Sequence, residues 1–362
     1  MTTQSIASPD TSRAWIDIDL GALLRNAEAL SRLAGAPLLP MVKADAYGLG
    51  AVAVARALDT LAPHGFGVAD VREGEELRSA GIDRPIIVFT PILPADMALA
   101  RAATLTPALD SAAGIAAWTE SGGGPWQLAI DTGMGRAGVP WDAMYAVADM
   151  VQRCPPDGAF THFHSAELDN ASLEEQDNRF RAALDALPAR PPLLHTQNSA
   201  AIVRQVPSPW SFVRPGVFLF GVGTGGGLNV LPEPVVHMRA RIVAIRDMKP
   251  GDTVSYDATW TARRPTRAAT LGVGYADGYR RALSNMGAVL IAGRKANVIG
   301  IVTMDMTMVD VTDIPCAVGD VVTMIGTSGD HTITVEDVAT ASRLSPYEIL
   351  TGLRQRLLRR YA

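Results

Sequence analysis

The chain has 362 residues, of which 48% are hydrophobic, which is enough for one large domain and a smaller one with separate cores. Its 32 basic and 37 acidic residues give a formal charge of -5 and are scattered, so no basic run points to nucleic acid. Cys154 and Cys316 lack the spacing of a metal or redox pair, and the sequence offers no apolar stretch of ~20 residues and no leader-like N-terminus. We expect two domains, no membrane partner and a cytoplasmic setting.

Helices and strands alternate along the first part of the chain. Leu20, Leu23, Leu24, Ala27 and Leu30 follow the N-cap residue type Asp19 at helical spacing, and Gly35 closes the run. Short apolar runs typical of strands lie at 38–42, 66–69, 86–89, 105–109, 126–130, 158–161, 192–194 and 212–213. Eight such strands with helices between them predict an α/β fold with a (β/α)8 TIM-type barrel rather than a doubly wound sheet. We assign residues 1–235 to this barrel, although the first residues could join the second domain.

A different pattern begins near Val236. VHMRARIVAIRDM alternates polar and apolar residues, and turn signals bound the runs that follow, which predicts a mostly β domain to about Val338. The tail from Ser345, with YEILTGLRQRLLRRY, predicts a helix. We assign residues 236–362 to this second domain. GTGGG at 223–227 is interpreted as a flexible loop. The alternative, a phosphate-binding loop, is disfavoured because neither Lys nor a helix follows it.

Polar residues that end the predicted barrel strands are the first candidates for chemistry, because these ends form the active face of such barrels. They are Lys43, Asp131, His162, His195 and Arg214. A lysine at the end of a buried strand loses hydration, which lowers its pKa and favours the free amine that a Schiff base requires. The alternative for Lys43 is a lysine whose ammonium reaches solvent from the barrel rim.

MVKADAYGLG at Met41–Gly50 resembles the cofactor-lysine motif of the alanine racemases, which depend on pyridoxal 5'-phosphate. The resemblance continues in order from Trp15 onward and covers nearly the whole chain. It includes IDTGMGRAGV (130–139), THF (161–163), NSAA (198–201), FVRPG (212–216), VSYDATW (254–260), GVGYADGY (272–279), MDMTMVD (304–310) and SPYEIL (345–350).

The resemblance implies a two-base racemisation of L-alanine and D-alanine. Lys43 would hold pyridoxal 5'-phosphate as a Schiff base and work on one face of the substrate carbon. Tyr256, supplied by the other subunit, would work on the opposite face. It therefore implies a homodimer whose active sites are shared between subunits.

The resemblance also implies the remaining contacts, and it includes no metal. Arg214 would lie against the pyridine nitrogen and keep it unprotonated, and His162 would lie beside the ring and link Arg214 to Tyr256. Tyr275 would line the entrance. The implied phosphate-binding residues are Tyr47, Ser199, Gly216, Val217 and Tyr347. The implied substrate-binding residues are Arg136, Met304 and Asp305, the last two lent by the partner chain near the substrate carboxylate.

One departure from the family pattern concerns Arg136. Many relatives have a lysine two residues before Asp-Thr-Gly, often carbamylated, but this chain has Ala129. Our hypothesis is that a bound anion such as chloride, or Asp45, holds Arg136 instead.

The entrance also departs from the pattern, because Ile301 stands where a gate arginine is common, Leu49 replaces a histidine and Arg280 a proline. These changes leave serine or a broader range of small amino acids open as substrates. Decarboxylases of the same architecture have a cysteine-bearing motif in the β domain. A decarboxylase is disfavoured here because Cys316 lies in an ordinary DIPCAVGD turn. A pyridoxal-phosphate carrier protein would resemble the barrel alone, so the β domain with Tyr256 argues against it.

Overall fold

The computed structural model describes residues 12–204, 207–225 and 230–362. These residues form two compact units, and each is described by itself. One unit contains Ala22–Glu233, and the other contains residues 12–21 and Pro234–Ala362. Part of the predicted loop at 223–227 lies outside the described residues, as does the beginning of the chain. No helix among the described residues is long and apolar enough to cross a membrane.

The first unit is built around a parallel sheet. Its strands pair in the order β2-β3-β4-β5-β7-β8, and β6 pairs with β5 at one side. The short strands are almost entirely buried apolar residues, such as Ile86, Ile87 and Val88, as expected of a parallel sheet that is covered on both faces. Their bounds are β2 Phe66–Val68, β3 Ile86–Val88, β4 Thr106–Leu109, β5 Gln127–Asp131, β6 Val139–Pro140, β7 Gly158–Phe160 and β8 Leu193–His195.

Two further segments continue this sheet into a ring. Parallel bridges join Leu38 to Val213, Met41 to Gly67 and Asn198 to Arg214. Backbone hydrogen bonds from Leu39 to Val213 and from Arg214 to Gln197 run through the same region. The eight predicted strand segments therefore all lie in one ring among the described residues, and the predicted α/β barrel is confirmed, with its first and last segments held by single bridges rather than full ladders.

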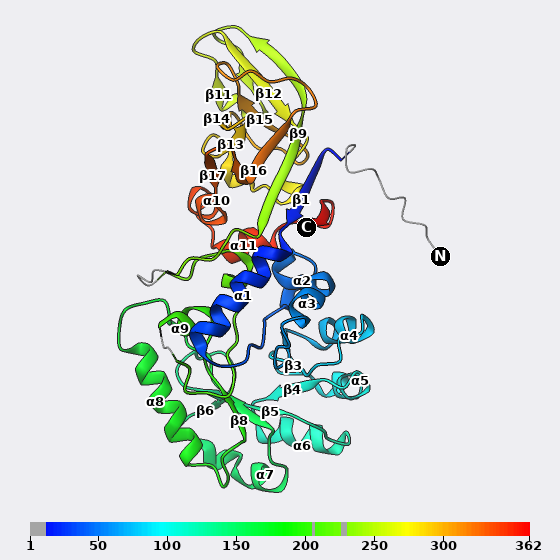
Figure 1. Cartoon of the computed structure of the whole chain (residues 1–362), viewed down its shortest axis with the longest axis vertical. Helices are drawn as coiled ribbons and strands as arrows, with labels where there is room; N and C mark the ends of the chain where they lie inside the picture. Colours follow the sequence, from blue (N-terminus) through cyan, green and yellow to red (C-terminus); the bar gives the residue numbers. More distant parts are fainter. Residues whose placement is uncertain (1–11, 205–206, 226–229) are drawn as a thin grey trace. The chain divides into compact units, whose positions relative to one another are not determined.

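Helices cover the outside of the ring (Figure 1). The first of them, α1, runs over Leu20–Ala34 and ends before Gly35, which has a φ of 59°, as its leucine spacing predicts. The others are α3 Ala51–Asp59, α4 Val71–Ser79, α5 Met97–Ala102, α6 Ala112–Glu120, α7 Ala148–Arg153, α8 Ser172–Asp185 and α9 Ser199–Arg204, with short 3-10 turns η2 Pro94–Asp96, η3 Met144–Ala146 and η4 Val217–Phe220.

The turn that carries Lys43, α2 (Lys43–Gly48), is left-handed. Ala44, Asp45, Ala46 and Tyr47 have φ between 51° and 57°, although none of them is glycine. This conformation crowds Cβ against the backbone, so surrounding contacts must hold it. One such contact is the Asp45 carboxylate, which accepts the N–H of Ala51 (2.7 Å) at the start of α3.

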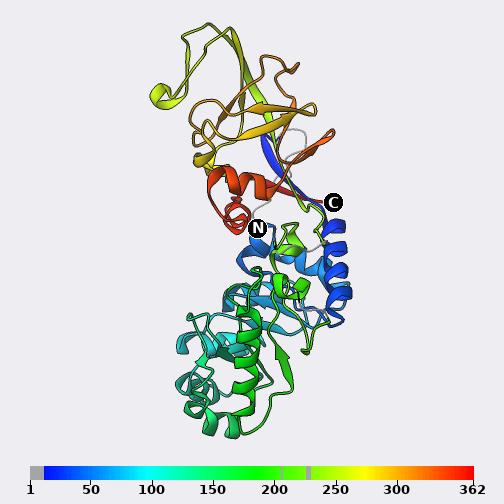
Figure 2. The ribbon, with the colours of Figure 1, turned by 90° about the vertical axis from the view of Figure 1, so that its left-hand side faces the viewer.

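The second unit is mostly β, as predicted. Its longest strand, β9 (Val236–Met248), pairs with β1 (Ala14–Ile18), β12 (Thr266–Leu271) and β16 (Val321–Ser328). Buried and partly exposed residues alternate along its first half, as in a sheet with one covered face. Figure 2 shows the twist of this sheet from the side. The remaining strands are β10 Thr253–Val254, β11 Trp260–Thr261, β13 Ala288–Ile291, β14 Arg294–Asn297, β15 Thr307–Asp310, β17 His331–Ile333 and β18 Leu358–Tyr361.

The helices of this unit are short, and the C-terminal tail differs from its prediction. The elements are η5 Tyr256–Ala258, η6 Tyr275–Asp277, η7 Arg281–Leu283, α10 Val335–Ser342 and α11 Pro346–Thr351. The predicted tail helix stops at Thr351, and the chain ends in β18, parallel to β1. The helical prediction for Leu358–Tyr361 is wrong because pairing with β1 outweighs the local preference of LRRY for a helix.

Candidate active site

Arg214 lies at the centre of the polar cluster in the barrel unit. Its Nη1 donates to Nδ1 of His195 (2.7 Å) and to the carbonyl of the same residue (2.8 Å). Its Nη2 donates to the carbonyls of Thr161 (2.8 Å) and Thr196 (3.1 Å). Burial lowers the pKa of Arg214 to about 9, which leaves the guanidinium protonated at neutral pH. These contacts fix a positive charge within the barrel without a carboxylate partner among the described residues.

His195 is fixed in one tautomer by its two neighbours. Because Nδ1 accepts from Arg214, the ring proton belongs on Nε2, which lies 3.2 Å from Oε1 of Gln127. The ring is fully buried and stacks against Phe160 and Phe212, with centroids 5.1 and 4.3 Å away. Burial and the charge of Arg214 both lower the pKa of His195, so the ring is neutral. His195 therefore serves to orient Arg214.

His162 lies on the other side of the guanidinium, immediately after β7 and Thr161. Its Nδ1 is 3.5 Å from Nη2 of Arg214. Burial lowers the pKa of His162 to about 3, and the charges of Arg214, Arg136 and Lys43 add to the effect. The imidazole is therefore neutral and can relay a hydrogen bond but does not carry a charge at neutral pH.

Lys43, the first residue of α2, is half-buried in the same cluster. Burial lowers its pKa, and the positive charges of Arg136 and Arg214 lower it further, while Glu73 raises it. The two oxygens of Glu73 accept the N–H groups of Ala44 and Ala69, both at 2.7 Å. Lys43 is therefore an amine with an increased free-base fraction, and two of its three charged neighbours are arginines, which favours anionic groups beside it.

A small cradle lies beside this cluster. The Ser199 hydroxyl accepts the N–H of Gly216 (2.8 Å), and both residues are buried. A Cβ placed on Gly216 would lie 2.5 Å from the Tyr47 hydroxyl, so glycine leaves room for that hydroxyl. Val217 opens η4 immediately afterwards. The structure thus brings Tyr47, Ser199, Gly216 and Val217 together, four of the five predicted phosphate-binding residues.

Arg136 belongs to the barrel unit, and the remaining predicted site residues belong to the second unit. Tyr256 begins η5 and is 68% exposed, and the carbonyl of Ile301 accepts the hydroxyl of Ser255 (2.7 Å) beside it. Tyr275 and Met304 lie on adjoining loops, since the Tyr275 N–H donates to Thr303 (3.0 Å) and the Ala276 N–H to Met304 (3.0 Å).

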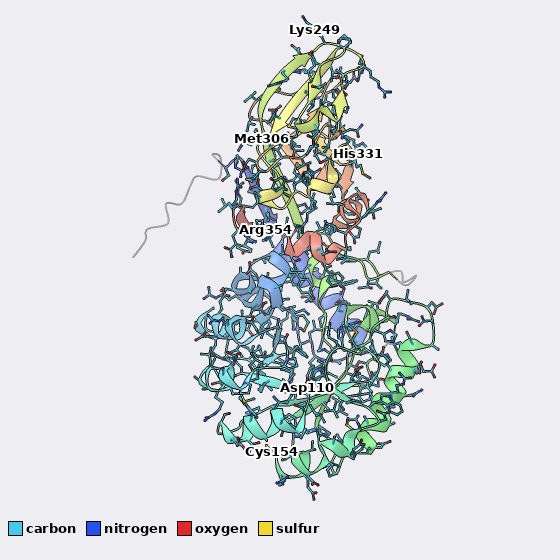
Figure 3. The ribbon with its side chains drawn as sticks, turned by 180° about the vertical axis from the view of Figure 1, so that it is seen from behind. Asp110, Cys154, Lys249, Met306, His331 and Arg354 are labelled. Carbon is cyan, nitrogen blue, oxygen red and sulfur yellow. The ribbon has the colours of Figure 1, made fainter. Side chains whose placement is uncertain are left out.

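The predicted residue Met304 is 52% exposed. Its neighbour Met306 is 45% exposed, and Figure 3 shows it at the surface of this unit. Tyr347, in α11, is 49% exposed.

Both parts of the chain match family models: "Alanine racemase, N-terminal domain" over residues 18–224 and "Alanine racemase, C-terminal domain" over residues 235–361. The chain belongs to the alanine racemase family. The alanine racemase of Halothermothrix orenii is 37% identical over 97% of this chain and 97% of its own.

Solved alanine racemase structures have the same fold. That from Bartonella henselae, with covalently bound pyridoxal phosphate, is 28% identical, covers 97% of this chain and 100% of its own, and has a TM-score of 0.90. That from Bacillus anthracis, with bound L-Ala-P, is also 28% identical, covers 98% of this chain and 96% of its own, and has a TM-score of 0.91.

Ala129 is one of the positions where this chain departs from the family pattern, and this departure bears on Arg136. Ala129, in place of the usual lysine, packs with Ala108 and Phe160 in an apolar cluster. Among the described residues no hydrogen bond or ion pair to Arg136 is found, and Asp45 caps α3 instead. Asp45 therefore does not hold Arg136 in this structure, and the anion alternative stays a prediction.

Sequence reasoning missed four residues that support the site. Glu73 lies beside Lys43, and Gln127 fixes His195. Asp277 and Arg356 join the loops that carry Tyr275 and Asp305. Only two of the four carried a usable signal, since Gln127 is polar within the apolar run WQLAI and Asp277 is part of GVGYADGY.

Proposed function

We propose that the chain is a pyridoxal-phosphate-dependent racemase that interconverts L-alanine and D-alanine. The observation that carries this proposal is the half-buried amine of Lys43, whose pKa is lowered by burial and by Arg136 and Arg214, in the same unit as the cradle formed by Ser199, Gly216 and Tyr47. The full-length similarity to alanine racemases supports alanine as the substrate.

The residues present fit the cofactor. Ser199, Gly216 and Tyr47 form a compact polar cradle in which any larger residue at 216 would clash with the Tyr47 hydroxyl. Anionic phosphate and substrate carboxylate would be favoured by the positive charges of Lys43, Arg136 and Arg214. When bound, the cofactor withdraws electrons from the substrate α-carbon and so makes its proton removable.

The chain's own residues then divide the proton transfers. Lys43 holds the cofactor and exchanges a proton at the α-carbon from one face, and Tyr256 does so from the other. Arg214 would face the pyridine nitrogen of the cofactor and, because it keeps its own proton, would leave that nitrogen unprotonated. This limits electron withdrawal and favours return of the proton over side reactions. Neutral His162 would link Arg214 to the phenol of Tyr256 of the partner subunit.

We propose a homodimer in which each subunit lends Tyr256, Met304 and Asp305 to the partner's site. Exposure supports this, since Tyr256 is 68% and Met304 52% exposed, so both side chains are accessible to a partner subunit. Symmetric dimers are the commonest assemblies of soluble enzymes. The free thiols of Cys154 and Cys316 agree with the cytoplasmic location that we propose.

The test is circular dichroism of the purified protein with L-alanine and, separately, with L-serine. Bound cofactor should absorb near ~420 nm and this band should vanish in Lys43→Ala, as expected of a lysine Schiff base. Tyr256→Phe should keep the band but lose turnover by about a hundredfold or more, because one of the two proton-transfer groups is gone. Equal rates with the two substrates would indicate a broader racemase, and a bound cofactor with neither reaction would contradict the proposal.

A further inference from the structure

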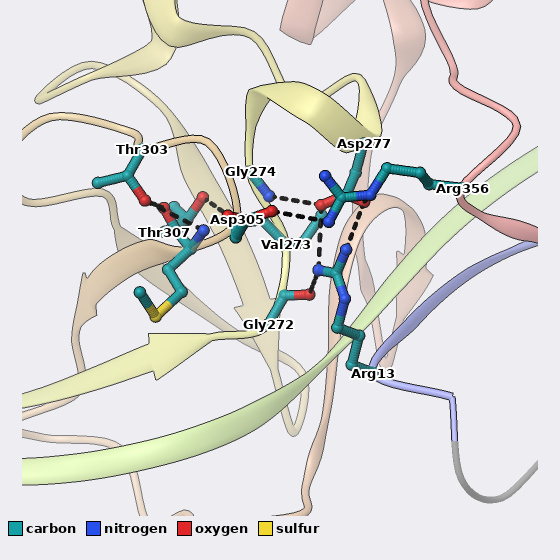
Figure 4. Close-up of polar contacts among 10 residues, drawn as sticks. Arg13, Gly272, Val273, Gly274, Asp277, Thr303, Asp305, Thr307 and Arg356 are labelled. Atoms are coloured by element: carbon teal, nitrogen blue, oxygen red, sulfur yellow. Dashed lines mark hydrogen bonds and ion pairs between the residues drawn. The ribbon is translucent and has the colours of Figure 1, made fainter.

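A fully buried carboxylate, Asp277, lies at the centre of an ion network in the second unit (Figure 4). Its Oδ1 is 2.7 Å from Nη2 of Arg13 and 3.3 Å from Nε of Arg356, and its Oδ2 accepts the N–H of Gly274 (3.0 Å). Arg13 also donates to the carbonyl of Gly272. Since the carboxylate is out of water, these partners determine where it and its loop lie.

Arg356 extends this network to a second carboxylate. Its Nη2 donates to Oδ1 of Asp305 (2.7 Å) while its Nε faces Asp277. The two carboxylates raise the pKa of Arg356, Asp305 through its hydrogen bond and Asp277 through its charge. Arg13 and Arg356 thus balance Asp277 and Asp305 one for one. Asp305 itself is 52% exposed.

The two loops joined in this way also share backbone hydrogen bonds. Tyr275 and Ala276 donate their N–H groups to the carbonyls of Thr303 and Met304, both at 3.0 Å. A Cβ at Gly274 would lie 2.5 Å from the Met304 carbonyl, so the loops approach as closely as backbone can. Tyr275, Met304 and Asp305 are therefore held as one block.

We propose that Arg356 is a positioning residue for substrate binding, which holds Asp305 and cancels its negative charge where the substrate carboxylate must approach. The inference rests on the proposed function, in which Met304 and Asp305 lie near that carboxylate. An unpaired Asp305 would repel the carboxylate and would no longer be held beside Met304. Arg13, which shares Asp277 but does not contact Asp305 in the described structure, supplies the matched control.

The test compares Arg356→Met with Arg13→Met in the holoenzyme. Propionate, which has the carboxylate of alanine but no amine, reports on carboxylate binding alone. Arg356→Met should raise both the KM for L-alanine and the inhibition constant of propionate about tenfold, the size expected of one unbalanced charge a few ångströms away. Both constants should fall again as salt is added, because screening weakens the repulsion. Arg13→Met should lower Tm but leave KM within about twofold, since Asp305 keeps Arg356 and the charge left unbalanced is that of Asp277, which is fully buried.

A second variant separates charge from structure. Removing both charges, in Arg356→Met with Asp305→Asn, should return KM to within about threefold of the wild type, because no charge is then left unbalanced. Arg356→Lys keeps the positive charge but cannot contact Asp277 and Asp305 through separate nitrogens as the guanidinium does, so it should give an intermediate KM. It replaces Arg356→Met in the comparison if that variant does not fold. A lower Tm with unchanged KM in Arg356→Met and Arg356→Lys, or an absence of rescue by Asp305→Asn, would overturn the proposal. Lack of racemisation by the wild type would instead overturn the proposed function.

Discussion

At the scale of single residues, the charges around Lys43 decide its protonation. Burial and Arg136 favour the neutral amine, while Glu73 favours the ammonium. Glu73 is itself held by the N–H groups of Ala44 and Ala69. The opposing effects of Arg136 and Glu73 can therefore be separated by substitution.

We predict that Arg136→Met raises the pKa of Lys43 and that Glu73→Gln lowers it further. Only the free amine attacks an aldehyde, so the midpoint of the pH–rate profile for capture of pyridoxal by the apoprotein follows this pKa. The wild-type midpoint should lie below that of an ordinary lysine, move to higher pH in Arg136→Met and to lower pH in Glu73→Gln. Lys43→Ala gives the background rate. Shifts of both variants in the same direction would show that these two charges do not act on Lys43 as the structure implies.

At the scale of elements, α2 combines an unfavourable backbone conformation with Lys43, the residue that we propose to hold the cofactor. A left-handed conformation costs about 1–2 kcal/mol per non-glycine residue. Four consecutive residues of α2 adopt it, and Ala44 among them is exposed, so its side chain gains little from packing. The change in stability on replacing Ala44 therefore measures mainly the cost of the backbone conformation.

We predict that Ala44→Gly stabilises the apoprotein by up to about 1 kcal/mol, because glycine adopts a positive φ without strain. The greater conformational entropy of glycine in the unfolded chain offsets only part of this gain. Ala44→Val should destabilise it by more than about 1 kcal/mol, because β-branching worsens the clash. The matched control is Ala53→Gly in the regular helix α3, which should cost about 1 kcal/mol. Urea midpoints measure all three, and destabilisation by glycine at both positions would contradict the left-handed turn.

Elements were predictable from sequence where local pattern and tertiary pairing agree. The apolar runs of the barrel and the helical spacing before Gly35 lie where the strands and α1 are found. β18 was not predictable, because LRRY gains its strand conformation only from pairing with β1, more than 300 residues earlier in the chain. The left-handed turn of α2 was missed because the residue types of KADAY do not predict positive φ angles.

At the scale of the whole molecule, the candidate site residues could be predicted from the sequence, but the long-range contacts that hold them could not. The resemblance to alanine racemases identified Asp305 and Tyr275 as candidate site residues. The pairing of Asp277 with Arg13, which are 264 positions apart, depends on how the two chain ends return to one sheet. Such a contact has no local signature, so it required the folded structure.

The proposed division of proton-transfer residues between subunits makes a prediction for mixed dimers. Lys43→Ala and Tyr256→Phe chains, each inactive alone, are coexpressed with different tags so that the heterodimer can be purified. One of its two sites then combines an intact Lys43 with an intact Tyr256, so it should have about half the wild-type activity. The control pairs Lys43→Ala with a chain carrying both substitutions, which leaves no intact site. If sites were built within one chain, the heterodimer would be as inactive as this control, because neither of its chains has both residues.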